Sequence, residues 1–199
     1  MATIDFYFDF HSPYSYLAHC RLPEIARRHG ATIAYHPIDL KAAKLAAGNT
    51  APPTVAIPPK LKFAIADFER WCARYGVSLT FSQAGPPEPT LPNIATFFAI
   101  DRGQAAEYVT AYWQATFASG GRVGDEAILR QVAAGLGWNG DEVVAYAASP
   151  EGAVRYAEEN AAAQARGVFG APIMMVGDEL WWGNDRLDFV DEYLSEKIA

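Results

Sequence analysis

Residues 5–18, DFYFDFHSPYSYLA, decide the fold of this chain. Residues 3–9 alternate and are rich in aromatic and β-branched side chains, which predicts a strand. A His-Ser-Pro turn follows, and apolar residues then recur at helical spacing over residues 16–30, closed by a glycine. Residues 31–38 predict a second strand. Strand, helix and strand with short connections form a βαβ unit, so the two strands should be parallel.

The end of the chain predicts the other half of the same sheet. Residues 172–176 are an apolar run, Gly177-Asp178 is a two-residue hairpin signal, and residues 179–182 continue as a further strand. A closing helix follows, with three apolar residues on one face: Leu187, Val190 and Leu194. From about residue 40 to 165 the chain shows helical stripes and almost no strand signal.

A β-α-β half and a β-β-α half around a helical segment form the pattern of a split thioredoxin fold. The predicted class is therefore α/β, a thioredoxin fold with an inserted all-helical domain. The predicted boundaries are residues 1–38 and 166–199 for the discontinuous thioredoxin-like domain, and residues 39–165 for the helical insertion.

Composition narrows the classes of function. The chain has 199 residues, is 51% hydrophobic and carries a formal net charge of −7, which argues against nucleic acid or an anionic membrane as the main partner. No apolar run approaches the roughly 20 residues that span a bilayer. The N-terminus has no basic region of a signal peptide, so a cytoplasmic location is expected. Cys20 and Cys72 form no C-x-x-C motif and lie on apolar stripes, which predicts buried thiols and argues against disulfide exchange.

Ser12-Pro13 is the first candidate site. Serine at an N-cap with proline at the next position is a standard helix start, and taken alone that structural interpretation is the stronger one. In a thioredoxin fold, however, this position follows the first strand and is where redox relatives carry a cysteine. Helix N–H groups there favour an anion. A serine hydroxyl can donate to a thiolate that a cofactor brings, and so stabilise its charged form.

Two further candidates lie near the end of the chain. Ala171-Pro172 precedes the third strand, where the thioredoxin fold has its cis-proline, and the backbone of Ala171 could pair with an extended peptide; the alternative is a simple strand-start proline. The segment Trp182-Gly183-Asn184-Asp185 predicts either an ordinary N-cap or a site for a free amino acid, such as the γ-glutamyl end of glutathione. Backbone N–H groups would take the carboxylate, and Asp185 would take the ammonium.

Three polar residues near the entry to the helical segment could bind a carboxylated substrate: Lys44, Asn49 and Lys60. Exposed lysines are more often plain surface. His11 adjoins Ser12, but neighbouring residues at a strand end point to opposite faces, so a role as base for Ser12 is not expected. The other histidines have no metal-ligand spacing, and no metal site is predicted.

Together these residues resemble the 2-hydroxychromene-2-carboxylate isomerase family, which is similar to kappa-class glutathione transferases and to DsbA-type oxidoreductases. The likeness rests on residues 5–18, on IDLKAAKLAAGNTAPP at 38–53, on DFERW at 67–71 and on VFGAPIMMVGDELWWGNDRL at 168–187. His11, the loop at 82–90 and Pro53-Thr54-Val55 depart from the family pattern.

The resemblance implies a glutathione-dependent cis–trans isomerase that acts by thiolate addition, bond rotation and elimination on an aromatic keto acid in naphthalene-type catabolism. It implies that Ser12 contacts the glutathione sulfur, that Ala171 and Pro172 hold the cysteinyl unit, and that Trp182 to Asp185 hold the γ-glutamyl end. It places Lys44 and Asn49 near the substrate, and it implies a homodimer. A kappa-like glutathione transferase and a non-catalytic glutathione-binding protein remain the alternatives.

Overall fold

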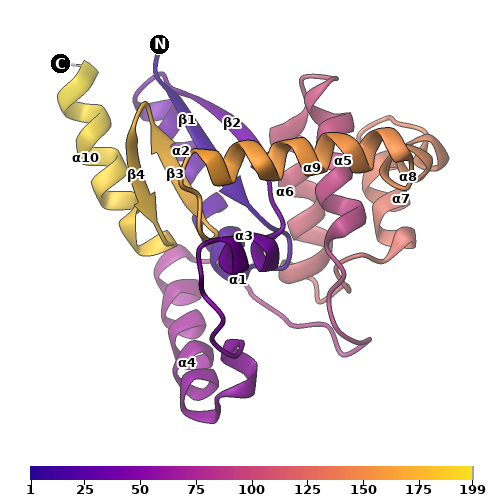
Figure 1. The fold of residues 1–199 in the computed structure, drawn as a ribbon, viewed down its shortest axis with the longest axis horizontal. Coiled ribbons are helices and arrows are strands. Elements are labelled where there is room, and N and C mark those ends of the chain that lie inside the picture. Colours follow the sequence, from indigo (N-terminus) through magenta and orange to yellow (C-terminus); the bar gives the residue numbers. More distant parts are fainter. Residues whose placement is uncertain (199) are drawn as a thin grey trace.

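A four-stranded mixed sheet organises the computed structural model, which describes residues 1–198. Its strand order is β2-β1-β3-β4. β1 (Thr3–Phe8) and β2 (Thr32–Pro37) are parallel, which confirms the predicted βαβ unit. β3 (Ile173–Val176) runs antiparallel to β1 and forms the predicted hairpin with β4 (Glu179–Trp182). Two segments far apart in sequence thus meet in the centre of the sheet (Figure 1).

The connection between β1 and β2 differs from the prediction of one helix. It is broken into α1 (Pro13–His19) and α2 (Leu22–Arg28). Pro23 has no backbone N–H and cannot bond to the carbonyl of His19, so the helix ends and restarts. The periodic apolar residues continue across the break, which is why their spacing alone indicated a single helix.

The middle of the chain is helical, as predicted. Its elements are α3 (Leu40–Ala46), the 3₁₀ turn η1 (Thr54–Ala56), α4 (Pro58–Tyr75), α5 (Thr90–Ile100), α6 (Ala105–Trp113), the π-helical turn η2 (Gln114–Ala118), α7 (Glu126–Gly135), α8 (Gly140–Ala147) and α9 (Pro150–Ala165). In Figure 1, α5 to α8 stand to one side of the sheet, α9 crosses in front of it, and α4 projects away below.

One aromatic core joins the sheet to these helices. The ring centroids of Phe8 and Phe10 lie 5.4 and 5.0 Å from that of Trp113 on α6, and Phe10 also packs on Tyr112 at 4.6 Å. All four side chains are buried. Aromatic pairs at such distances add packing energy beyond the area they bury. The division into two domains stays a prediction, since the sheet and the helical segment share this core.

The closing helix and the two thiols complete the fold. α10 (Leu187–Ile198) follows the short 3₁₀ turn η3 (Asn184–Arg186), and Leu187, Val190 and Leu194 are all buried, as predicted. Cys20 and Cys72 are free and partly buried. Burial raises the pKa of the Cys20 thiol to about 11, so it is a poor nucleophile at neutral pH. No helix in residues 1–198 is long and apolar enough to cross a membrane.

Candidate active site

Ser12 begins α1 and is held on two sides. Its backbone is extended (φ −93°, ψ 111°), and its Oγ accepts a hydrogen bond from the Ser15 N–H at 3.2 Å, so it is the N-cap that the sequence predicted. The same hydroxyl donates to the carbonyl oxygen of Ala171 at 3.4 Å. Only 3% of Ser12 is exposed. The structure therefore brings together two predicted site residues that are 159 positions apart in the chain.

Ala171 and Pro172 lie directly before β3. The peptide bond between them is cis, as expected for this position in a thioredoxin fold. The Pro172 carbonyl accepts a hydrogen bond from the Gly183 N–H at 3.0 Å, which ties this step to the end of β4. Within residues 1–198, no hydrogen bond involves the N–H of Ala171. A partly exposed backbone donor thus lies beside the Ser12 hydroxyl.

Trp182 and Gly183 shape the neighbouring turn. Trp182 is 56% exposed, and its ring packs against Phe169 with centroids 5.2 Å apart. A Cβ added at the buried Gly170 would lie 3.1 Å from Trp182 Nε1, so the indole rests on this glycine. Gly183 has φ +104°, and a Cβ there would collide with Asp185 Oδ1. The turn therefore requires glycine.

Asn184 and Asp185 do not form the ordinary N-cap that was the structural alternative. Gly183 precedes η3, and no side chain caps it. Asn184 is instead buried, its backbone carbonyl accepts from Tyr75 at 3.3 Å, and its side-chain Nδ2 has no partner in the described residues. An unpaired buried amide donor is costly unless a ligand uses it. Asp185 is about half exposed and pairs with Arg186 at 2.9 Å.

Tyr14 is a site neighbour that the sequence did not single out. Its hydroxyl donates to Asp67 at 3.2 Å, which links α1 to α4. Burial, together with the charges of Asp67 and Asp185, raises the pKa of Tyr14 to about 12. Residues of η3, in the WGND turn, contact α1, so this turn lies close to Tyr14. The DFERW motif that contains Asp67 was the available signal.

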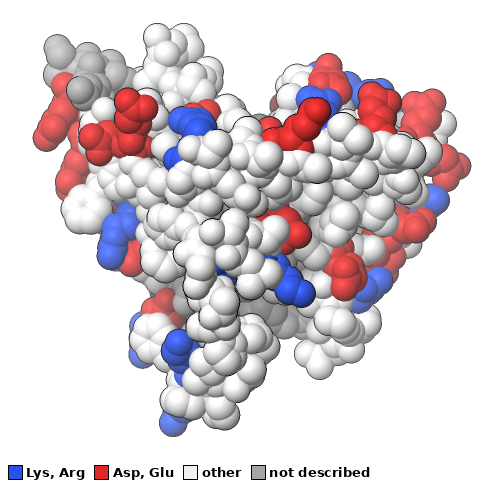
Figure 2. All heavy atoms as spheres, viewed as in Figure 1, with Lys and Arg blue, Asp and Glu red and all other residues white. Residues whose placement is uncertain are grey.

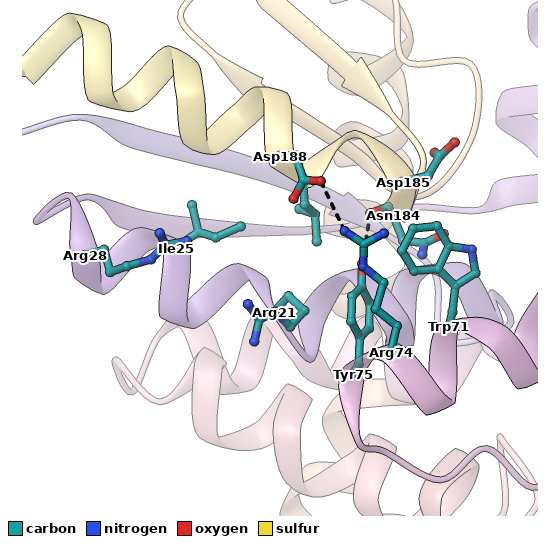
Figure 3. A pocket seen from close by; sticks show the side chains of 10 residues that line it. Arg21, Ile25, Arg28, Trp71, Arg74, Tyr75, Asn184, Asp185 and Asp188 are labelled. Atoms are coloured by element: carbon teal, nitrogen blue, oxygen red, sulfur yellow. Dashed lines mark hydrogen bonds and ion pairs between the residues drawn. The ribbon is translucent and has the colours of Figure 1, made fainter.

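A cavity of about 150 Å³ opens behind this turn (Figure 3). In the figure, Asp188 points toward Arg74, with which it pairs at 3.4 Å, whereas Asp185 points away. Ser12 and Ala171 do not line this cavity. The residues that do are Arg21, Ile25, Arg28, Trp71, Arg74, Tyr75, Asn184, Asp185, Leu187 and Asp188.

The predicted substrate residues lie in and after α3 and at the start of α4. Lys44 is in the last turn of α3, Asn49 follows that helix, and Lys60 is in the first turn of α4. All three are exposed, and Asn49 accepts a hydrogen bond from the Ala51 N–H at 3.2 Å. Among the described residues, no hydrogen bond or ion pair joins them to Ser12. Their role stays a prediction.

Charge is unevenly spread over the face that carries α3 and α9. Figure 2 shows acidic side chains both along its right-hand margin, over the helical segment, and at its upper left, while its centre is largely uncharged. Near Ser12, the ring of His11 is exposed, and within residues 1–198 it makes no hydrogen bond to the Ser12 hydroxyl. Within the same range, no cluster of three metal-ligating side chains is present.

Asp9 and Asn93 form a buried polar pair beneath the site, which the sequence analysis missed. Burial raises the pKa of Asp9, while hydrogen bonds from the His11 and Leu40 N–H groups and from Asn93 oppose that rise. The available signals were a carboxylate in the aromatic run FYFDF and an amide in the apolar helix LPNIATFF. Buried polar residues in apolar segments need specific partners.

Comparisons with known proteins agree with this geometry. The sequence model of the DSBA-like thioredoxin domain family matches residues 3–195. The chain is 45% identical to a 2-hydroxychromene-2-carboxylate isomerase from Sphingobium xenophagum, over 96% of this chain and 97% of that protein. It is 39% identical to an isomerase of the same name from Pseudomonas putida, over 92% of this chain and 90% of that protein.

Solved structures give the same result. A 2-hydroxychromene-2-carboxylate isomerase superposes with a TM-score of 0.92 at 38% identity, covering 98% of this chain and 95% of that one. The cytosolic disulfide reductase DsbM from Pseudomonas aeruginosa, solved with GSH, superposes with a TM-score of 0.67 at 16% identity, covering 98% of each chain; that likeness concerns the fold alone. The chain therefore has the DSBA-like thioredoxin fold and belongs to the 2-hydroxychromene-2-carboxylate isomerase family.

Proposed function

We propose that this isomerase binds glutathione with the sulfur at the Ser12 hydroxyl and the cysteinyl backbone beside Ala171. The observation that carries the proposal is the 3.4 Å contact between Ser12 Oγ and the Ala171 carbonyl, next to an Ala171 N–H without a partner in the described residues. An extended peptide pairs with such an exposed N–H and C=O in the manner of a short added strand.

The residues present fit the amino-acid end of glutathione as well. Asn184 Nδ2 is a buried donor without a partner among the described residues, and Asp185 offers an exposed carboxylate in the same turn. The first can donate to the γ-glutamyl carboxylate, and the second can accept from the γ-glutamyl ammonium. Asp185 would have to release Arg186, and because both side chains are about half exposed this exchange costs little.

The protein's part in the chemistry follows from the Ser12 hydroxyl. The chemistry that glutathione supplies when bound is reversible addition of a thiolate to a conjugated substrate, which lets the former double bond rotate before elimination. Ser12 has one proton to donate, and its present acceptor lies at 3.4 Å, the long end of the hydrogen-bond range. Turning this hydroxyl from Ala171 to a sulfur stabilises the thiolate form and lowers the thiol pKa. Ser12 itself attacks nothing.

We propose 2-hydroxychromene-2-carboxylate or a close analogue as the substrate, because the relatives at 45% and 39% identity are isomerases of that compound. Lys44 and Lys60 supply cations for the substrate carboxylate and for the enolate that develops during addition, and Asn49 supplies an amide. Because the three side chains are exposed, they need to turn toward Ser12 when substrate binds. The homodimer and the cytoplasmic location expected from the sequence belong to this proposal too.

The proposed function is tested by measuring whether turnover requires glutathione and whether it consumes glutathione. Isomerisation of 2-hydroxychromene-2-carboxylate is followed by absorbance while free thiol is titrated in the same sample. The expected result is no turnover without glutathione, and many turnovers per glutathione with no loss of thiol. Loss of thiol in step with substrate would indicate a kappa-like transferase. Glutathione binding measured by calorimetry with neither reaction would indicate a non-catalytic binding protein.

A further inference from the structure

We infer that the buried pair Asp9–Asn93 is a positioning device that sets the Ser12 loop and the start of α3 relative to each other. The inference rests on the proposed function, in which the Ser12 hydroxyl bonds to the glutathione sulfur and α3 carries the substrate-binding Lys44. Asp9 is 2% exposed and Asn93 0%, and within residues 1–198 neither side chain forms a hydrogen bond with the Ser12 hydroxyl, Ala171 or Lys44. They act through the backbone that they hold.

Asp9 fixes the loop that ends at Ser12. Its Oδ1 accepts from the His11 N–H at 2.8 Å, and its backbone carbonyl accepts from the Ser12 N–H at 2.9 Å. Asn93 holds Phe10, which lies between Asp9 and His11, because its Oδ1 accepts from the Phe10 N–H at 3.2 Å. The side chains of the buried pair thus hold two successive N–H groups, and the Asp9 backbone holds the third. The position of the Ser12 hydroxyl follows from that backbone.

The other oxygen of Asp9 holds α3. Its Oδ2 accepts from the Leu40 N–H, the first of that helix, at 2.9 Å. Within residues 1–198, Asp9 Oδ2 is the only hydrogen-bond acceptor of the Leu40 N–H, and the preceding Asp39 N–H bonds to Asn160 Oδ1 of α9 at 2.7 Å. The Asp9 carboxylate therefore connects the loop after β1 to the loop after β2. Its Oδ1 bonds to the Ser12 loop at His11, and its Oδ2 bonds to the start of α3 at Leu40.

Asn93 completes the set and fixes its orientation. Its Nδ2 lies 3.2 Å from Asp9 Oδ1, 3.2 Å from the Ile38 carbonyl and 2.9 Å from the Tyr156 hydroxyl. The Phe10 N–H needs an acceptor, so the amide oxygen of Asn93 faces it, and the two Nδ2 hydrogens serve two of these three acceptors at a time. The Asp9 side chain in turn accepts from three donors, the His11 N–H, the Leu40 N–H and Asn93 Nδ2, and an ionised carboxylate has acceptor sites for all three.

Two variants distinguish the two arms of this device, which are the hydrogen bond of Asp9 to the Ser12 loop and its hydrogen bond to the start of α3. Asp9→Asn keeps the shape but puts an NH₂ group where donors converge, and it should disturb both arms. Leu40→Pro removes the N–H that reaches Asp9 Oδ2, together with the partly buried leucine side chain, at a first-turn position where proline is tolerated and after a residue with extended backbone (φ −81°, ψ 100°). Val143→Ala, a buried position on α8 outside this network, serves as the control for a general loss of stability.

The experiment combines amide hydrogen exchange with steady-state kinetics at a temperature where all variants are folded. For Asp9→Asn we expect the Ser12 and Leu40 amides to exchange at least tenfold faster than in Val143→Ala, and kcat at saturating glutathione to fall at least tenfold. For Leu40→Pro we expect kcat within threefold of wild type and a KM for the carboxylate substrate raised about fivefold or more.

Asp9→Asn with exchange and kcat both within twofold of Val143→Ala would overturn the inference, because Asp9 would then contribute stability alone. Equal losses of kcat in Leu40→Pro and Asp9→Asn would overturn the separation into two arms. Failure of the proposed function has a different signature, in which wild-type enzyme shows no glutathione-dependent turnover. The exchange rates at Ser12 and Leu40 then still decide whether Asp9 positions the two segments.

Discussion

The hydroxyl of Ser12 lies 3.4 Å from the carbonyl oxygen of Ala171, and this contact joins the first helix of the chain to the cis-proline step before β3. The bond is long, while the bond from the Ser15 N–H to the same hydroxyl is an ordinary cap. The serine oxygen is therefore held in place while its proton can be redirected.

Gly170→Ala tests whether Trp182 shapes the glutathione site. The new Cβ would lie 3.1 Å from the indole nitrogen, and because Trp182 is half exposed the ring can move aside. We expect a change of less than about 1 kcal/mol in the free energy of unfolding, and glutathione affinity weakened about fivefold by calorimetry. Gly135→Ala on α7, where nothing lies within 4 Å, is the control and should leave affinity unchanged. Wild-type affinity in Gly170→Ala would remove Trp182 from the site.

Asp185→Asn tests the γ-glutamyl assignment. The amide keeps the shape of the turn but loses the charge that would pair with an ammonium, so we expect glutathione affinity to fall about tenfold with kcat at saturation within threefold of wild type. Exposed charge pairs are worth about 1 kcal/mol or less, and a ligand pair in a formed site exceeds that. Asp178→Asn in the β3–β4 hairpin is the matched control. Identical affinities in the two variants would rule the assignment out.

We expect His36 to stabilise the folded protein most in mild acid. Burial lowers its pKa, but hydrogen bonds to Glu159 at 2.7 Å and Asp5 at 3.1 Å outweigh burial, and the net pKa is raised above 6.5. A raised pKa means that the contribution is complete below pH 6.5 and is lost as the pH rises through the raised value. His36→Gln should therefore destabilise more at pH 6 than at pH 9 in urea unfolding. An equal loss at both pH values would contradict this.

We expect His19 to show the opposite pH dependence, with a contribution to stability that is lost as the pH falls. Burial lowers its pKa from 6.5 to about 4, and its Nε2 bonds to Thr110 Oγ1 at 2.8 Å. The Thr110 hydroxyl donates to the Ala106 carbonyl, so the neutral imidazole is the donor. A lowered pKa means that this stability is complete above pH 6.5 and is lost as the pH falls toward 4, by up to about 3 kcal/mol. His19→Gln should flatten the fall in unfolding free energy between pH 6.5 and 4.5. Parallel curves for both proteins would refute it.

Local patterns predicted the strands, the parallel βαβ unit and the helical middle segment, because alternation and helical spacing are properties of short windows. The break at Pro23 was missed because the apolar stripe continues through it. Ser12 and Ala171 were predicted as site residues through the fold and the family resemblance, and the structure places them in contact. The isomerase prediction is confirmed by the relatives.

Long-range polar partners could not be predicted in this way. Asp9 and Asn93 are 84 positions apart, and nothing in either local pattern says that one bonds to the other. The same holds for Tyr14 with Asp67 and for Tyr75 with Asn184, since each pair forms only when α4 docks on the thioredoxin scaffold. The positions of Lys44, Asn49 and Lys60 relative to a substrate depend on side chains that are exposed here, and neither spacing nor packing fixes them.

The most direct test of the central claim compares Ser12→Ala with wild type, measuring kcat at saturating glutathione and the dissociation constant of glutathione by calorimetry. Removing one donor to a charge that develops in a reaction costs about 10²-fold in rate. We therefore expect kcat to fall by about that factor while the dissociation constant of glutathione changes by less than about threefold. Wild-type kcat in Ser12→Ala would contradict the account, because the thiolate would then be stabilised without the Ser12 hydroxyl.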